Sequence, residues 1–324
     1  MRRFVPIAFV SLLLLGRATA QDSGLVVGSG NFFSPIVANL EKAVAFYRDG
    51  LSLEAAGAPA SADDNAPLRN MFGLPDAHLR WNVARPSGMR QGVEIVEITS
   101  AGGHPLDRRI IDPGAMTLVM STPDAPAQIA DRLKALGGTI VSAPATTDVG
   151  GRARLVVARD PDDHFVQLFV IGRNAMPLPP RVRLTVKNVD RSVALYRDAL
   201  GLHASGAAPV SDEWLMTALG IAPGGAASSV LEVPGSGLVI EFVQFTARTR
   251  TVAGRIQDPG STRLQLQVRD LDAAIKAVVA AGGQVVSTGG MPVELPGGRG
   301  AAIRAAIVRD PDNLFLVLIQ SAAR

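Results

Sequence analysis

The 324-residue chain carries 32 Lys and Arg against 29 Asp and Glu, with four His and no Cys. Three arginines fall within residues 1–20, so the remainder holds 29 basic side chains (32 less 3) against 29 acidic ones. This balance excludes a general attraction to nucleic acid or to an anionic membrane surface. The lack of Cys excludes disulfides and thiolate metal sites.

The first 20 residues predict a secretory signal peptide. A basic tripeptide at residues 1–3 precedes an apolar run over residues 4–15, and small residues at 18–20 suit a cleavage site. The apolar run is too short to span a bilayer. A buried helix is the alternative. We expect cleavage after Ala20 and a soluble protein in the periplasm or outside the cell, with no membrane contact after cleavage.

The rest of the chain is a duplication. Asn-Leu-Glu-Lys-Ala-Val-Ala-Phe-Tyr-Arg-Asp at residues 39–49 matches Asn-Val-Asp-Arg-Ser-Val-Ala-Leu-Tyr-Arg-Asp at residues 188–198. In both segments Asn suits a helix N-cap and apolar residues recur at helical spacing. Asp-Pro-Asp turns at residues 160–162 and 310–312 each lie between two β-type runs. We therefore predict two homologous domains, at residues 30–172 and 181–324, joined by a Pro-rich linker at residues 173–180.

Each domain reads as strand, helix and three strands, twice over. Strands are expected over residues 32–37, 79–84, 92–99, 117–121, 140–142, 154–158, 165–171, 181–186, 228–233, 238–245, 263–268, 305–308 and 315–320. Helices are expected over residues 40–49, 125–136, 189–200 and 271–281, the second and fourth ended by Gly-Gly. The Gly/Pro-rich residues 292–300 are a candidate lid.

This order and these motifs resemble the vicinal oxygen chelate superfamily, which includes glyoxalase I, extradiol dioxygenases, methylmalonyl-CoA epimerase and bleomycin-resistance proteins. The match rests on the helices at residues 39–49 and 188–198, the Gly-Gly pairs, and the two Asp-Pro-Asp turns. It implies an α+β fold in which four βαβββ modules form two cupped eight-stranded mixed sheets with the helices outside. It implies no single reaction, because one fold supports many chemistries.

Some members of this superfamily bind a metal inside the cup, and the resemblance carries their ligand positions onto this chain. In the first domain these positions are Phe32, Glu94, Thr117 and Gln167, and in the second they are Arg181, Glu241, Arg263 and Val317. A transition metal needs about three or more N or O donors. We therefore expect no metal cofactor. The alternative is a lyase or dioxygenase that uses Fe, Mn, Ni or Zn, with Glu94, Gln167 and either His78 or His104 as ligands.

Strand alternation predicts what the second cup contains instead, because residues two apart share a face. The predicted ligand-binding residues of this cup are Arg181, Arg183, Arg263, Gln265, Gln267, Phe245 and Phe315, with Glu241 as a candidate catalytic base. Guanidinium groups hold carboxylates bidentately. The leading hypothesis is thus an exported protein that binds a small organic anion without a metal, or acts on it as a lyase or isomerase. An adjacent arginine keeps a glutamate ionised and weakens it as a base, which favours binding over catalysis.

Two alternatives to ligand binding stay open. The first alternative, for the second cup, is that Arg181 and Arg263 form an internal ion-pair network with Glu241 instead of binding a ligand. The first cup, with Phe32, Glu94, Thr117 and Gln167 in an apolar hollow, is either a second ligand site or filled scaffold. A non-catalytic interaction protein would have both cups closed by its own side chains, and a homodimer is compatible with every reading.

Overall fold

The computed structural model describes residues 24–55, 57–142, 147–149, 153–172, 176–207, 213–222, 224–296 and 302–321. The predicted signal peptide, linker residues 173–175 and lid residues 297–300 lie outside these ranges. No helix of the described residues is long and apolar enough to cross a membrane.

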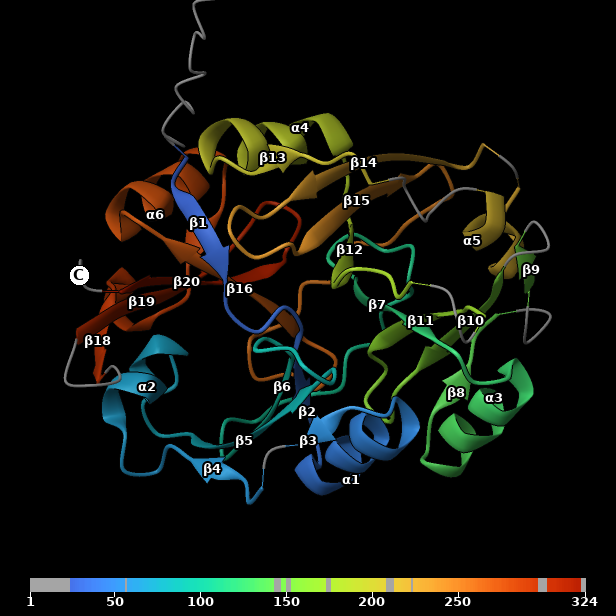
Figure 1. Ribbon diagram of the computed structural model, residues 1–324. Helices are drawn as coiled ribbons and strands as arrows, with labels where there is room; N and C mark the ends of the chain where they lie inside the picture. Colours follow the sequence, from blue (N-terminus) through green and yellow to red (C-terminus); the bar gives the residue numbers. More distant parts are fainter. Residues whose placement is uncertain are drawn as a thin grey trace, which may run out of the picture.

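Four βαβββ modules follow one another along the chain (Figure 1). Module 1 contains β2 (Ser34–Val37), α1 (Leu40–Ala45) with a π-helical continuation (Phe46–Gly50), β3 (Glu54–Ala55), β4 (Ala60–Ser61), α2 (Ala66–Met71), β5 (His78–Arg85) and β6 (Val93–Thr99). Module 2 contains β7 (Met116–Thr122), α3 (Pro126–Ala135), β8 (Thr139–Ile140), β9 (Thr147–Val149), β10 (Ala153–Arg159) and β11 (Phe165–Val170).

The second half of the chain repeats this order. Module 3 contains β12 (Arg181–Thr185), α4 (Val189–Val193) with a π-helical continuation (Ala194–Ala199), β13 (His203–Ala204), α5 (Glu213–Ala218), β14 (Ala226–Glu232) and β15 (Val239–Phe245). Module 4 contains β16 (Thr262–Val268), α6 (Leu271–Ala280), β17 (Gln284–Val285), a 3-10 turn (Thr288–Gly290), β18 (Val293–Pro296), β19 (Ala302–Arg309) and β20 (Phe315–Ser321). A short strand, β1 (Val26–Ser29), precedes module 1 and pairs with β16.

The strands form two mixed sheets, each with a main path of eight strands, which confirms the predicted α+β fold with two mixed sheets. Sheet I runs β17-β19-β20-β16-β2-β6-β5-β3, and β1, β4 and β18 extend it to 11 strands. Sheet II runs β13-β14-β15-β12-β7-β11-β10-β8, and β9 extends it to nine. Sheet I therefore unites modules 1 and 4, and sheet II unites modules 2 and 3.

This pairing corrects the expectation that each half of the chain forms its own cup. The junction of sheet I places Ser34 of β2 opposite Arg263 of β16, and the junction of sheet II places Thr117 of β7 opposite Arg183 of β12. Alternation along a strand fixes which side chains share a face, but it does not fix which strand lies alongside. The sequence repeat therefore could not assign the modules to their sheets.

Helices pair differently from strands. α3 packs beside the helical segment that follows α1, and α6 packs beside the segment that follows α4 (Figure 1). Arg132 Nε donates to the carbonyl of Gly50 at 3.0 Å, and Arg191 Nη2 donates to the carbonyl of Ala281 at 2.9 Å. Consecutive modules thus join through their helices, while the sheets join modules of opposite halves.

The Asp-Pro-Asp turns reinforce the contacts between consecutive modules. Asp160 accepts a hydrogen bond from Tyr47 Oη at 3.0 Å, and Asp310 accepts one from Tyr196 Oη at 2.9 Å. Each aspartate also accepts backbone N–H bonds from its own turn. The turns contain a positive-φ residue, Asp163 in one and Asn313 in the other, a conformation that Asp and Asn tolerate well.

Apolar side chains fill three regions. The largest cluster lies between the sheets and the helices α1, α3, α4 and α6. The second covers the inner face of sheet II, where α5 contributes Leu215 and Met216. The third covers the inner face of sheet I, where Met71 and Phe72 come from α2 and the residue after it. The helices α2 and α5 were not predicted, and each covers the inner face of one sheet.

Candidate functional site

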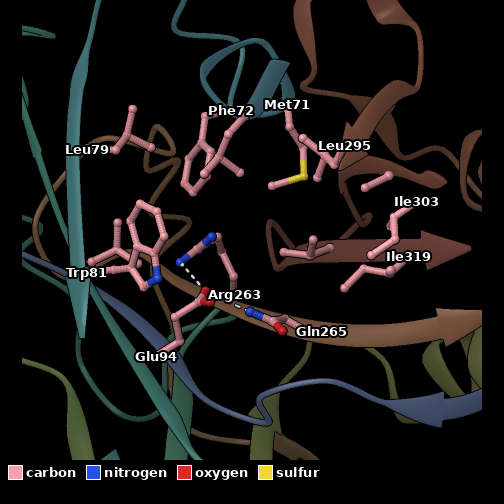
Figure 2. Close-up of a pocket in the computed structure, with 14 residues that line it drawn as sticks. Met71, Phe72, Leu79, Trp81, Glu94, Arg263, Gln265, Leu295, Ile303 and Ile319 are labelled. Carbon is pink, nitrogen blue, oxygen red and sulfur yellow. Dashed lines mark hydrogen bonds and ion pairs between the residues drawn. The ribbon is translucent and has the colours of Figure 1, made fainter. Parts of the chain in front are cut away.

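A cavity of about 230 Å³ lies on the inner face of sheet I (Figure 2). Strands β5 and β6 of module 1 and β16, β19 and β20 of module 4 supply most of its wall. α2 and β18 contribute Met71 and Leu295, which lie on the same side of it in Figure 2. Of the 14 lining residues, three carry charged or amide groups: Glu94, Arg263 and Gln265. Such an apolar hollow with a few polar groups is typical of a small-molecule site.

Pairing of strands from opposite halves brings the polar groups together. Arg263 Nη2 lies 3.2 Å from Glu94 Oε2, and Gln265 Nε2 donates to the same oxygen at 2.7 Å (Figure 2). Gln265 Nε2 also lies 3.3 Å from Ser34 Oγ, and its Oε1 accepts from the backbone N–H of Asn31 at 3.0 Å. Arg263 and Gln265 share a face because they are two residues apart on β16. The amide of Gln265 is therefore fixed with its N–H group toward the carboxylate.

The guanidinium of Arg263 is buried, with 1 % of the side chain exposed. Its Cζ lies 4.6 Å from the ring centroid of Phe72, within range for a cation–π contact. Its Nε has no hydrogen-bond partner among the described residues. Burial lowers the pKa of Arg263, and the nearby Glu94 carboxylate opposes that change. The cavity thus holds a desolvated cation with one N–H donor unsatisfied.

The donors in this cavity do not suit a divalent metal. Glu94 is the one carboxylate among the described residues that line it, and a guanidinium and an amide N–H already occupy the same oxygen of that carboxylate. A cation beside the carboxylate disfavours a second cation there. No group of three or more His, Cys, Asp or Glu is placed to hold a metal within the part of the chain that the structure describes. That the protein binds no metal nevertheless stays a prediction.

The two histidines of the metal-dependent alternative do not line the cavity. His78 is exposed, and its Nδ1 lies 3.0 Å from Asp63 Oδ1. His104 is exposed in the connection between modules 1 and 2, where its backbone N–H bonds Asp258. Gln167 lies on sheet II and therefore cannot join Glu94 in one ligand set.

A second polar cluster lies on the inner face of sheet II. Arg183 Nε is 3.5 Å from Glu241 Oε2, and Arg181 Nη1 is 4.0 Å from the same oxygen. Arg183 Nη1 also donates to Gln167 Oε1. All four side chains are buried, as is that of Thr117. The two arginines thus form ion pairs with one carboxylate, as the ion-pair alternative predicts for Arg181, whereas Arg263 lies in the other sheet.

The predicted cup with three arginines is therefore wrong, because Arg263 and its neighbour Gln265 face Glu94 of module 1. The other predicted site residues are scattered. Phe32 is buried between sheet and helices, Phe315 lies on the inner face of sheet I, and Phe245 lies on that of sheet II. Gln267 is exposed opposite β1. The predicted first cup is divided as well, with Glu94 in sheet I and Thr117 and Gln167 in sheet II.

Two aromatic residues of the cavity were missed as site residues. Neither Trp81 nor Phe72 is among the predicted site residues, yet both line the cavity (Figure 2). Alternation along β5 places Leu79 and Trp81 on one face, which could have indicated Trp81. No pattern in the sequence indicated that Phe72 would stack on an arginine 191 residues away.

Comparisons with known proteins agree with this architecture. The family described as Glyoxalase/Bleomycin resistance protein/Dioxygenase superfamily matches residues 31–168 and 179–318. No curated protein matches the chain.

Two solved structures illustrate the likeness in fold. Glyoxalase I from Zea mays is 18% identical with a TM-score of 0.60, over 92% of each chain. A putative dioxygenase from Bacillus subtilis is 12% identical with a TM-score of 0.52, over 93% of this chain and 87% of the other. At these identities the likeness extends to the fold alone.

Proposed function

Since the chain belongs to the Glyoxalase/Bleomycin resistance protein/Dioxygenase superfamily, in which fold does not determine the reaction, we propose its function from the cavity of sheet I. The protein binds a small organic anion there, with an apolar body and a carboxylate head. No metal takes part in this binding.

The buried guanidinium of Arg263 is the observation that carries the proposal. Nη2 contacts Glu94, and Nε has no partner among the described residues. A buried N–H donor without an acceptor costs about 1–3 kcal/mol, and more on a charged group. The Arg263 side chain borders the cavity, so a ligand carboxylate bound there would form a charge-assisted bond with the guanidinium in a dry site. Glu94 does not prevent this, because its own charge is offset by the N–H groups of Arg263 and Gln265.

The size and lining of the cavity define the rest of the ligand. An apolar cavity of about 150 Å³ holds one benzene molecule. By proportion, 230 Å³ holds a body of about nine non-hydrogen atoms. Trp81, Phe72 and Met71 offer aromatic and thioether surfaces (Figure 2), which suit an aryl or branched alkyl group.

Binding fits the geometry better than proton transfer does. Glu241, the predicted base, is fully buried beside two arginines in sheet II. In the cavity the carboxylate is Glu94, whose Oε2 accepts two N–H bonds. That oxygen is therefore already engaged by two N–H groups and is not free to accept a proton from a ligand. Export remains part of the proposal on the strength of residues 1–20 alone.

Calorimetric titration of the protein lacking residues 1–20 tests this function. Benzoate, phenylacetate and 4-methylpentanoate should bind, and the corresponding primary amides should bind at least tenfold more weakly. Arg263→Met should abolish the difference in affinity between each carboxylate and its primary amide. The matched control is Arg304→Met, which removes an exposed guanidinium paired with Asp272 and should leave binding unchanged.

Absence of binding by every carboxylate, or equal binding of acids and amides to the wild type, contradicts the proposal. Metal independence is tested separately by elemental analysis of protein purified without chelators. Stoichiometric Fe, Mn, Ni or Zn would contradict that part.

A further inference from the structure

The carboxylate of Glu94 has one oxygen that the proposed function does not use. Oε2 accepts from Arg263 Nη2 at 3.2 Å and from Gln265 Nε2 at 2.7 Å. Oε1 forms no hydrogen bond or ion pair with any residue that the structure describes. Each oxygen of an ionised carboxylate can accept about two hydrogen bonds. The acceptor sites of Oε1 are therefore unused, whereas those of Oε2 are filled.

This unused oxygen is open to the cavity of sheet I. Glu94 and Val96 lie two residues apart on β6 and both line the cavity, so both side chains point to the inner face of the sheet. Val93 and Ile95 point to the other face and pack in the cluster between sheets and helices. Of the Glu94 side chain 19 % is exposed, and Oε1 is not among the fully buried polar atoms that lack a partner. The cavity therefore offers an accessible carboxylate oxygen as well as a guanidinium.

The surroundings of Oε1 define the group from which it accepts. Oε2 of the same carboxylate contacts the guanidinium, so Oε1 lies beside the place where a ligand carboxylate meets Arg263. The donor must therefore lie close to the carboxylate on the ligand. Among the other described lining residues, only Gln265 carries a side-chain oxygen, and that oxygen already accepts from the backbone N–H of Asn31. One free acceptor suits the single O–H of a hydroxyl, whereas an ammonium group brings three N–H donors.

We propose that the ligand is a 2-hydroxy carboxylic acid, whose carboxylate binds the Arg263 guanidinium and whose hydroxyl donates to Glu94 Oε1. This inference rests on the proposed function and specifies the head of the ligand. A hydroxyl that donates to an ionised acceptor forms a short, strong hydrogen bond. The positive end of the O–H bond also offsets part of the repulsion between the ligand carboxylate and that of Glu94.

Calorimetric titration with three acids of one carbon skeleton tests the inference. The protein lacking residues 1–20 is titrated with 4-methylpentanoate, 2-hydroxy-4-methylpentanoate and 4-methyl-2-oxopentanoate. The hydroxy acid should bind about tenfold more tightly than either of the other two, as expected for a hydrogen bond to a charged acceptor. The oxo acid is the critical comparison, because it keeps an oxygen at position 2 but has no hydrogen there to donate.

Glu94→Gln gives a second test. Arg263 Nη2 and Gln265 Nε2 both donate to the position of Oε2, so the new amide keeps its oxygen there and places its NH₂ group at the position of Oε1. The free acceptor thus becomes a donor, and the oxo acid should bind this variant at least as tightly as the hydroxy acid does. The control Asp272→Asn, which changes an exposed carboxylate paired with Arg304, should keep the preference for the hydroxy acid.

Equal binding of the three acids to the wild type would overturn the inference and leave the proposed function standing. A preference for the hydroxy acid that persists unchanged in Glu94→Gln would overturn it as well. Binding of none of the three acids would contradict the proposed function itself, and the inference with it. The comparison of acids on the wild type needs no variant, so it decides the matter even where Glu94→Gln does not fold.

Discussion

Arg263 Nη2 and Glu94 Oε2 lie 3.2 Å apart although 169 residues separate them along the chain. Arg263 belongs to module 4 and Glu94 to module 1, and they meet because β16 pairs with β2 and β2 pairs with β6. The cavity lining likewise comes from both modules. The candidate site therefore requires residues from both halves of the chain.

The first prediction follows from this pairing of strands from opposite halves of the chain. Residues 21–172 or 179–324 expressed alone should not give a monomer that unfolds cooperatively, because each half leaves the edges of its central strands without the native partners. Co-expressed halves should copurify in a 1:1 complex and unfold in one transition. Size-exclusion chromatography with light scattering and circular dichroism provide the measurements. A stable, cooperative monomer from either half would show that the modules can pair in another way.

The second prediction concerns the charge balance in the cavity. Glu94→Gln leaves the buried guanidinium without its carboxylate and should destabilise the protein by about 3 kcal/mol. Arg263→Met should cost less, because an apolar side chain of similar length replaces the buried cation. The double variant should therefore be more stable than Glu94→Gln alone.

Urea denaturation of the wild type, the two single variants and the double variant gives the coupling energy between Glu94 and Arg263. The exposed pair Asp272 and Arg304 serves as the control cycle and should show a coupling of about 0–1 kcal/mol. Additive effects of Glu94→Gln and Arg263→Met would contradict a direct interaction.

Particular residues show how far the sequence predicts this molecule. The helix N-caps Asn39 and Asn188 and the two Asp-Pro-Asp turns act through neighbours in sequence, and the structure contains both as predicted. The inward direction of Arg263 also followed from alternation along one strand. Its partner did not, because strand pairing depends on the loops between modules and on packing of the whole sheet. An arginine and a glutamate therefore lie together as predicted, but the glutamate beside Arg263 is Glu94 and not Glu241.

The third prediction concerns the attachment of α2 to module 4. Ser287 Oγ donates to the carbonyl of Met71 at 2.8 Å and accepts from the backbone N–H of Ile307 at 2.9 Å. Ser287→Ala leaves that buried carbonyl and N–H without this partner, at a cost of about 1–3 kcal/mol. Because Met71 and Phe72 line the cavity, the variant should also release a bound carboxylate faster.

Urea denaturation measures the stability change, and stopped-flow tryptophan fluorescence measures the release rate. Ser236→Ala is a suitable control, since the Ser236 hydroxyl bonds the carbonyl of Val233 in a module 3 turn away from the cavity. An unchanged release rate in a destabilised Ser287→Ala protein would mean that this bond supports the fold without holding the cavity wall.

The last prediction concerns Asp310, the buried aspartate of the second turn. Burial and the neighbouring Asp312 carboxylate raise the pKa of Asp310 from 3.8 to about 7, although hydrogen bonds from Leu314 and Tyr196 lower it. The folded state thus favours the protonated acid more than the unfolded chain does. This contribution to stability is complete below about pH 4, and it is lost as the pH rises through about 7.

Asp310→Asn mimics the protonated side chain and keeps an oxygen for the backbone N–H groups of Asp312 and Leu314. Relative to this variant, the wild type should lose unfolding free energy between pH 4 and 7, and the difference should level off above pH 8. Urea denaturation at each pH measures it, with the exposed Asp272→Asn as control. A difference that does not vary across this range would mean that Asp310 is ionised in the folded protein throughout, held by the N–H groups of its own turn.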